Sequence, residues 1–338
     1  MKERSRFMGI AAFALVAIAA VALYSDGALV PRALADGGGG PPSSSVVPDA
    51  VSDAVAAIPA QFRVDESGAA TYSIPLFTVP GTAGVVPQLS LEYSSQGGYG
   101  PLGRGWSLGG TSAISRCRAT REAGDFISGG VPVDGNPRPV DYSATDRYCL
   151  DGQRLLAAVD GAACAAVGGT TVQTLRTEIE SFQRVCAYTA VGGTSGPAYF
   201  TVERKDGSIS WYGDRDHHPS VTRPDGFVET NAPGHAGTAM LWAQTRFQDS
   251  SGNYIDYLYA KNPGSPAASV EHLLTEVRFT GKNVLAGQGG SAKAPYAKLL
   301  FNYEMRPQAQ WSQGHASGAT LVQRWRMTSI VSCASAAP

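Results

Sequence analysis

The sequence predicts a mainly β fold, in which antiparallel hairpins form sandwich-like or open-shell sheets. Charged residues make up only 16% of the 338 residues, while glycine occurs 40 times and proline 21 times. Such a composition suits short strands and tight turns better than long solvated helices. Apolar and polar residues alternate with a period of two in many short runs, and no segment after residue 58 keeps a helical period. Little helix is therefore expected outside the N-terminal segment.

The N-terminus has the layout of a secretory signal peptide, which we expect to span residues 1–35. Three basic residues precede an apolar run at 8–24, and Ala33-Leu34-Ala35 is a small-x-small cleavage pattern. The Gly-, Pro- and Ser-rich residues 36–57 are expected to form a flexible linker. We therefore expect a secreted protein that is extracellular or held at a bacterial cell surface. An uncleaved signal would instead anchor the chain, and this is the only membrane contact expected.

Residues 58–338 are expected to form one β domain that continues beyond the given sequence. Strands are predicted at 62–64, 72–76, 89–93, 148–150, 153–156, 199–204, 208–212, 241–247, 254–259, 274–280, 297–304 and 322–331. The first two strands flank the polar turn Asp65-Glu66-Ser67-Gly68. Asp151-Gly152 and Asp206-Gly207 each accept the positive φ angles of a type I′ turn, so each predicts a tight hairpin.

Export would place the five cysteines in an oxidising compartment. Cys117, Cys149, Cys164 and Cys186 can then form two bridges, although the sequence permits three pairings of four cysteines. We favour the pairs of sequence neighbours, Cys117–Cys149 and Cys164–Cys186. Cys333 is left over, and its partner is expected to lie beyond residue 338.

Several short sequence motifs, found in a fixed order, resemble those of a known family. They lie at 68–75, 87–98, 100–103, 105–108, 114–117 and 146–155. Gly105-Trp106-Ser107-Leu108 and Ile114-Ser115-Arg116-Cys117 are two of them. From about Ile58 to its end, the chain resembles the N-terminal domain shared by SpvB-type virulence proteins and the B component of insecticidal toxin complexes (TcdB and TcaC type). The resemblance implies a long parent protein that carries propeller repeats and RHS/YD repeats.

A second resemblance lies within the strand unit near 241–304. Asp249-x-x-Gly252-Asn253-Tyr254-Ile255-x-Tyr257-x-Tyr259 resembles one YD-like repeat, in which a Gly-Asn turn reverses the chain and alternate residues share a sheet face. In the family, such sheets form a shell around a toxic cargo. The resemblance therefore implies a shell-building role. Its implied partners are the remainder of the same polypeptide (propeller and RHS repeats) and other toxin-complex subunits.

Glu178-Ile179-Glu180 is the most specific catalytic candidate in the sequence. ADP-ribosyltransferases use a Glu-x-Glu pair, and alternate residues of a strand lie on one side of it. That enzyme class also needs an arginine strand and a Ser-Thr-Ser strand, and this sequence contains no Ser-Thr-Ser. We therefore interpret residues 177–182 as an ordinary exposed strand and predict no catalytic residues.

No metal or cofactor site is predicted either. The Asp and His residues at 214–218 are metal-type ligands, but His217 and His218 are adjacent and would point to opposite faces of a strand. A polar loop is the preferred interpretation. Asp249-x-Ser251-x-Asn253 is similar to the start of a calcium loop, but Tyr254 and Ala260 stand where an EF-hand needs glycine and glutamate.

The sequence favours a non-catalytic structural or assembly module. The residues expected to carry that role are Cys117, Cys149, Cys164, Cys186, Asp151, Gly152, Asp206, Gly207, Gly105, Trp106, Gly252 and Asn253.

The main alternative is a secreted carbohydrate-binding or adhesion module, since five tryptophans could form a platform on which sugars stack. Core or sheet-face positions are, however, more typical of tryptophan. An ADP-ribosyltransferase is the third alternative. A formal net charge of -1 gives no support to nucleic-acid binding.

Overall fold

The computed structural model describes residues 60–120, 127–128, 131–132, 138–143, 146–158, 161–191, 196–213, 225–261, 270–285, 287 and 289–334. The chain divides into two units, Met1–Ala56 and Ala57–Pro338, and the described residues belong to the second. The predicted signal peptide (1–35), the predicted linker (36–57) and the Asp/His cluster at 214–218 lie outside the described residues. Among the described residues, no helix has the length and apolar character needed to span a membrane.

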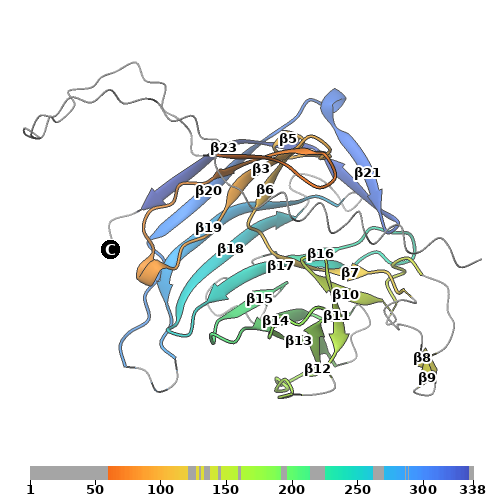
Figure 1. The fold of residues 1–338 in the computed structure, drawn as a ribbon, viewed down its shortest axis with the longest axis vertical. Coiled ribbons are helices and arrows are strands. Elements are labelled where there is room, and N and C mark those ends of the chain that lie inside the picture. Colours follow the sequence, from red (N-terminus) through yellow and green to blue (C-terminus); the bar gives the residue numbers. More distant parts are fainter. Residues whose placement is uncertain are drawn as a thin grey trace, which may run out of the picture. The chain divides into compact units, whose positions relative to one another are not determined.

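The described part is almost entirely β, which confirms the predicted fold class (Figure 1). The strands are β1 (Gln61–Val64), β2 (Ala70–Pro75), β3 (Ser90–Ser94), β4 (Tyr99–Gly100), β5 (Gly103–Arg104), β6 (Trp106–Gly109), β7 (Ala113–Cys117), β8 (Ile127–Ser128), β9 (Val131–Pro132), β10 (Arg147–Leu150), β11 (Gln153–Ala157), β12 (Thr170–Thr177), β13 (Arg184–Ala190), β14 (Tyr199–Glu203), β15 (Ile209–Tyr212), β16 (Phe227–Glu229), β17 (Ala239–Gln248), β18 (Asn253–Lys261), β19 (His272–Lys282), β20 (Ala297–Met305), β21 (Ser312–Ala316), β22 (Ala319–Gln323) and β23 (Trp325–Ala334). Single 3-10 turns occupy η1 (Thr82–Gly84) and η2 (Gln308–Gln310).

Eight antiparallel strands of the largest sheet close into a small barrel. They follow the order β17-β7-β10-β11-β12-β13-β14-β15, and β15 pairs back onto β17. A common buried cluster fills the space that these strands enclose: Ile114, Leu150, Leu155, Leu175, Val185, Ala187, Phe200, Val202, Tyr212, Ala239 and Trp242. The sequence predicted hairpins in sandwich-like or open-shell sheets and did not specify this closure. Closure removes strand edges that would otherwise be exposed.

Beyond β17, the large sheet continues through β18, β19, β20 and β23. These strands contain most of the YD-like unit expected near 241–304. Their apolar face includes Tyr257, Val277, Phe279 and Leu299, and side chains from residues 76–89 pack against it. A long segment of mostly irregular backbone thus supplies the second layer of this core.

A separate four-stranded sheet has the order β1-β2-β3-β6. Its register places Phe62, Tyr72, Tyr93 and Trp106 in one row across the four strands. Alternation predicted a strand at 62–64, and β1 is present there. It is an edge strand, however, and Phe62 and Val64 are 65% and 64% exposed. Alternation alone does not distinguish such an edge strand from a covered one.

The Asp151-Gly152 hairpin has the predicted geometry. Asp151 and Gly152 have φ angles of 49° and 83°, so both central residues adopt the positive φ of a type I′ turn. Leu150 and Gln153 pair directly across the turn. Here the dipeptide alone was sufficient to predict the local structure.

The Asp206-Gly207 turn differs from the prediction. Of its two named residues only Gly207 has a positive φ, at 79°, and the backbone N–H of Arg204 donates to the carbonyl of Ser208 at 2.9 Å. Three residues therefore separate the paired ends, as in a type I turn followed by a glycine bulge. The predicted type I′ geometry was wrong here, although the hairpin itself is present.

Candidate functional site

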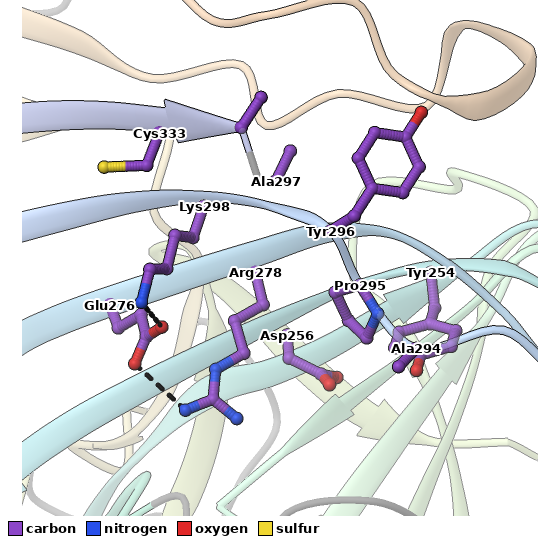
Figure 2. A pocket seen from close by; sticks show the side chains of 11 residues that line it. Tyr254, Asp256, Glu276, Arg278, Ala294, Pro295, Tyr296, Ala297, Lys298 and Cys333 are labelled. Carbon is purple, nitrogen blue, oxygen red and sulfur yellow. Dashed lines mark hydrogen bonds and ion pairs between the residues drawn. The ribbon is translucent and has the colours of Figure 1, made fainter. Parts of the chain in front are cut away.

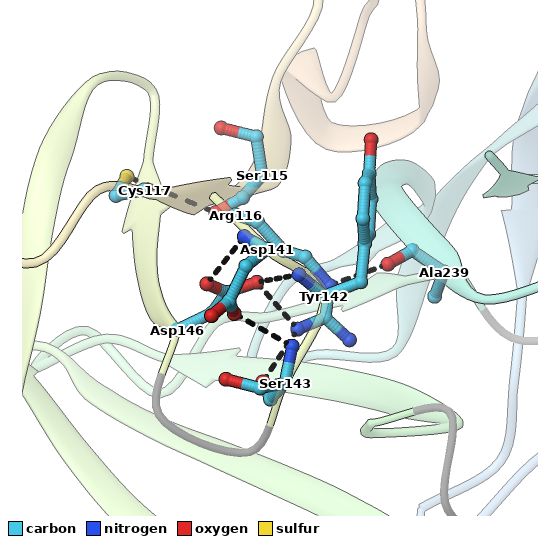
Figure 3. A network of polar contacts seen from close by, with 8 residues as sticks. All are labelled: Ser115, Arg116, Cys117, Asp141, Tyr142, Ser143, Asp146 and Ala239. Atoms are coloured by element: carbon cyan, nitrogen blue, oxygen red, sulfur yellow. Dashed lines mark hydrogen bonds and ion pairs between the residues drawn. The ribbon is translucent and has the colours of Figure 1, made fainter. Parts of the chain in front are cut away.

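Arg116 is the centre of a buried polar network on the barrel (Figure 3). Its Nη1 lies 3.0 Å from Oδ2 of Asp146, and both side chains are almost completely buried. Its Nε donates to the carbonyl oxygen of Ala239 at 2.6 Å, and Nη1 also donates to the carbonyl of Ser143 at 3.2 Å. Arg116 thus joins β7, the start of β17 and the segment before β10.

Asp146 is held by backbone groups as well as by Arg116. The backbone N–H groups of Asp141 and Tyr142 donate to its two carboxylate oxygens at 3.1 and 2.9 Å. Burial raises the pKa of the Asp146 carboxyl, and the hydrogen bonds from the Asp141 backbone and from Arg116 oppose the rise. Both carboxylate oxygens therefore accept hydrogen bonds that fix the position of the chain. This arrangement favours a structural role for Asp146 over proton transfer.

A second polar region lines a cavity of about 520 Å³ beside β18, β19, β20 and β23 (Figure 2). Arg278 lies 3.0 Å from a carboxylate oxygen of Glu276, and Nζ of Lys298 lies 3.6 Å from the other. Burial opposes ionisation of Glu276, but the hydrogen bond and charge of Arg278, together with Lys298, outweigh it and lower the pKa of Glu276. Cys333 also lines this cavity.

The same face carries a buried ion pair between adjacent strands. Arg246 and Asp256 are cross-strand partners, and the guanidinium binds both carboxylate oxygens, at 2.6 Å from Nε and 2.9 Å from Nη2. The Tyr254 ring lies 4.0 Å from the guanidinium carbon of Arg246. The acidic groups of this cavity are thus engaged by cations, so the arrangement favours cross-linking of strands over acid–base chemistry.

The Glu178-Ile179-Glu180 motif lies in a loop. β12 ends at Thr177, so the predicted exposed strand over residues 177–182 was wrong. The carboxylate of Glu180 accepts from the backbone N–H of Phe182 at 2.6 Å and thereby closes a turn. Glu178 lines a different, disulfide-containing cavity. The two carboxylates therefore do not share one side of a strand.

Both favoured disulfides are present. Cys117 and Cys149 join the adjacent strands β7 and β10, and Cys164 joins Cys186 of β13, with Cα–Cα distances of 5.9 and 5.8 Å. Cys333 carries no disulfide. The two pairs are separated by 32 and 22 residues in the sequence, and sequence proximity was a correct guide to both.

Gly105, Trp106 and Gly252, which were also expected to have a structural role, lie in close contact with neighbouring segments. Gly105 has a φ of 78°, and a Cβ there would lie 2.7 Å from the carbonyl of Ser94. The adjacent Trp106 packs against Tyr93, with ring centroids 5.3 Å apart. Gly252 has a φ of 87°, and a Cβ there would lie 2.4 Å from the carbonyl of Asn283.

Asn253 and Asp249 form a closed hydrogen-bonded turn. The Asp249 carboxylate accepts from the backbone N–H of Asn253 at 2.7 Å and from its side-chain amide at 2.7 Å. It also accepts from the backbone N–H of Ser251 at 2.9 Å. Its oxygens thus stabilise the turn, and within the described residues no group of three His, Cys, Asp or Glu side chains could hold a metal ion.

His272 is a partly buried titratable group that the sequence did not single out. Its ring stacks on Tyr259 with centroids 4.4 Å apart, and Nε2 lies 2.9 Å from the carbonyl oxygen of Asp225. Desolvation lowers the pKa of His272 to about 4, and the nearby charge of Lys261 adds to this shift. The imidazole is therefore neutral near pH 7.

The fold should lose stability as the pH falls, because His272 binds its proton more weakly when folded than when unfolded. The loss begins near the ordinary histidine pKa of about 6.5 and is complete below the folded pKa, where it reaches about 3 kcal/mol. Urea unfolding of the protein and of His272→Gln between pH 7 and pH 4 measures this difference. Parallel pH profiles for the two proteins would contradict the assignment.

The buried arginines are the site residues that sequence reasoning missed. Arginine is mostly exposed in proteins, so neither Arg116 nor Arg246 was a candidate. A signal was nevertheless present for Arg116, because it and Asp146 both lie within phrases that carried the family resemblance. Arg246 offered no comparable signal.

Comparisons with known proteins agree with this architecture. The family model for SpvB, the Salmonella virulence plasmid 65kDa B protein, matches residues 64–284. A comparison with curated proteins found no match. The structure of the N-terminal domain of effector protein SpvB from Salmonella typhimurium strain LT2 has a TM-score of 0.52 and 19% identity, covering 77% of this chain and 87% of that one.

Toxin-complex structures share the fold as well. The crystal structure of TcdB2-TccC3-TEV has a TM-score of 0.61 and 18% identity over 84% of this chain. The Tc holotoxin pore from Photorhabdus luminescens has a TM-score of 0.56 and 18% identity over 78% of this chain. This chain spans about 14% of the first of these chains and 13% of the second. Because the family model covers more than half of its length, the chain belongs to the SpvB family.

Proposed function

We propose that this chain is a non-catalytic structural and assembly module of an exported SpvB- or RHS-type bacterial toxin or cell-surface protein. It would contribute to a shell or scaffold that carries or docks a toxic domain. Family membership supports this proposal, and so do the structural neighbours, which include a Tc holotoxin pore. The two disulfides suit an oxidising compartment and support secretion.

The observation that carries the proposal is the edge of the large sheet at β23. This ten-residue strand ends the sheet order, and no described strand pairs with its outer side, although the backbone N–H of Met327 donates to the carbonyl of Pro101 at 2.9 Å. An edge strand presents backbone donors and acceptors that can pair with another strand. Val331 on this strand is 41% exposed. The proposed occupants are the remainder of the same polypeptide, with its propeller and RHS repeats, or another toxin-complex subunit.

Val331→Lys should weaken association with the proposed occupant, the propeller and RHS segment of the same polypeptide, by about tenfold or more, because a charge at an edge strand disfavours strand addition. Size-exclusion co-elution and titration calorimetry of the chain with that segment measure the effect. Ile179→Lys is the matched control, since Ile179 is 70% exposed on a loop between β12 and β13. Unchanged affinity for Val331→Lys, or no association of the unaltered chain, would count against the proposal.

The carbohydrate-binding alternative has one supporting observation, the aromatic row on the small sheet. The Tyr72 and Trp106 rings, however, meet at 87°, and the Tyr93 and Trp106 rings at 50°. A sugar-stacking platform needs ring faces that are open to the ligand, whereas these rings pack against one another. The geometry therefore favours a role in holding the sheet together. An ADP-ribosyltransferase has less support, because Glu178 and Glu180 lie outside any strand.

A further inference from the structure

We propose that the Cys117–Cys149 disulfide is a thiol-exchange site, which a small anionic thiol such as glutathione attacks at Cys117. The bridge lines a cavity of about 470 Å³ together with Arg118, Arg154 and Glu178. Cys117 is partly exposed, whereas Cys149 is 8% exposed. Both cysteines line the cavity, and Cys117 is the more exposed of the two, so it is the expected point of attack for an incoming thiolate. This inference does not depend on the proposed assembly role.

The charges around the cavity favour an anionic thiol. Arg118 is exposed, and the side chain of Arg154 donates to the carbonyl oxygen of Arg118 at 2.9 Å, which keeps both residues at the same rim. Among the described residues of the lining, Glu178 is the one acidic residue. The described lining thus carries two cations and one anion, and this net positive charge raises the local concentration of an anion such as glutathione.

The second disulfide provides an internal reference. Cys186 is completely buried and Cys164 is 8% exposed, and both belong to a small core cluster with Tyr188 and Tyr199. Those two tyrosine rings stack with centroids 4.4 Å apart. Neither Cys164 nor Cys186 lines the cavity at Cys117. The two bridges of one molecule therefore differ in access.

The exchange follows ordinary thiol–disulfide chemistry. The glutathione thiolate attacks Sγ of Cys117, the protein S–S bond breaks, and the electron pair leaves on Sγ of Cys149, which then takes a proton from water. A second glutathione thiolate attacks the glutathione sulfur of the mixed disulfide. Oxidised glutathione leaves, and Cys117 is released as a thiolate that is protonated in turn. Two thiols are oxidised for each protein disulfide reduced.

The bridge lies beside the Arg116–Asp146 ion pair and closes the segment that contains Asp146. Cys117 directly follows Arg116, as Figure 3 shows, and Cys149 lies shortly after Asp146 on β10. Opening the bridge would therefore leave the β7–β10 pairing and this ion pair to hold the segment without a covalent link. The exchange site is thus placed where reduction would loosen the barrel locally.

The test measures the opening rate of each bridge in the intact, oxidised chain. The protein is incubated with reduced glutathione or with neutral 2-mercaptoethanol, quenched by alkylation, and analysed by peptide mass spectrometry. We expect Cys117–Cys149 to open at least about tenfold faster than Cys164–Cys186, since exchange depends on access to the sulfur. Near-UV circular dichroism before quenching verifies that the fold is retained. Equal rates for the two bridges, or no opening of Cys117–Cys149, would overturn the proposal.

Charge variants test the preference for an anionic thiol. Arg118→Gln should slow the reaction with glutathione about threefold to fivefold, and Glu178→Gln should accelerate it by a similar factor, as expected for one exposed charge. Neither change should alter the rate with 2-mercaptoethanol. If Arg118→Gln slows both thiols equally, the rim charge does not select the anion, and that part of the proposal is overturned.

Discussion

Replacing Asp256 with alanine is expected to lower the free energy of unfolding by about 3–5 kcal/mol. Its carboxylate binds Arg246 through two hydrogen bonds, and the two side chains are 2% and 0% exposed. The substitution removes the negative charge but leaves the guanidinium buried on β17. Water cannot replace the lost partner without opening the sheet, so the cost includes the desolvation of an uncompensated cation.

Urea unfolding at pH 7 measures this cost, and Glu276→Ala is the matched control. Glu276 also pairs with cations on the same cavity lining, but its partners Arg278 and Lys298 are 40% and 46% exposed. An exposed pair contributes only about 0–1 kcal/mol. The double replacement Arg246→Met with Asp256→Leu should recover most of the stability, because no charge remains buried. A similar cost for Asp256→Ala and Glu276→Ala would contradict this account.

Local features of the fold were predictable from the sequence. The Asp151-Gly152 turn followed from the conformational preferences of two residues, and the bridge between Cys117 and Cys149 followed from their proximity. Most predicted strands correspond to observed ones, because alternation is a property of each strand alone. The predicted type I′ turn at Asp206-Gly207 was wrong because the length of the loop depends on where strand pairing begins. The dipeptide does not specify that position.

Non-local features were not predictable. The barrel closes through pairing of β15 with β17, and nothing in either strand's own pattern specifies this partner. Residues 177–182 were expected to form a strand, but β12 ends at Thr177 and the Glu180 side chain closes a turn instead. Buried ion pairs depend on two residues meeting across strands, so the burial of Arg116 could not be derived from its own segment.

Trp242→Ala is expected to lower the free energy of unfolding by about 3–5 kcal/mol, which is the usual cost of removing a buried tryptophan. Trp242 is completely buried in the barrel interior. Its ring centroid lies 5.0 Å from that of Phe200 and 5.5 Å from that of Tyr148. Its indole N–H donates to the carbonyl of Pro197 at 2.8 Å. The substitution removes contacts to several strands at once.

Trp211→Ala is the control that shows whether the cost of Trp242→Ala comes from packing in the barrel interior or from the loss of a tryptophan at any position. Trp211 lies on β15, a strand of the same barrel, but its side chain is only partly buried and is not part of the interior cluster. We expect it to cost about 1 kcal/mol, in the range of changes away from the core. Urea unfolding of both variants measures the difference. Equal costs would mean that the interior around Trp242 adapts to the loss, and that closure of the sheet, more than the packing of its contents, stabilises the barrel.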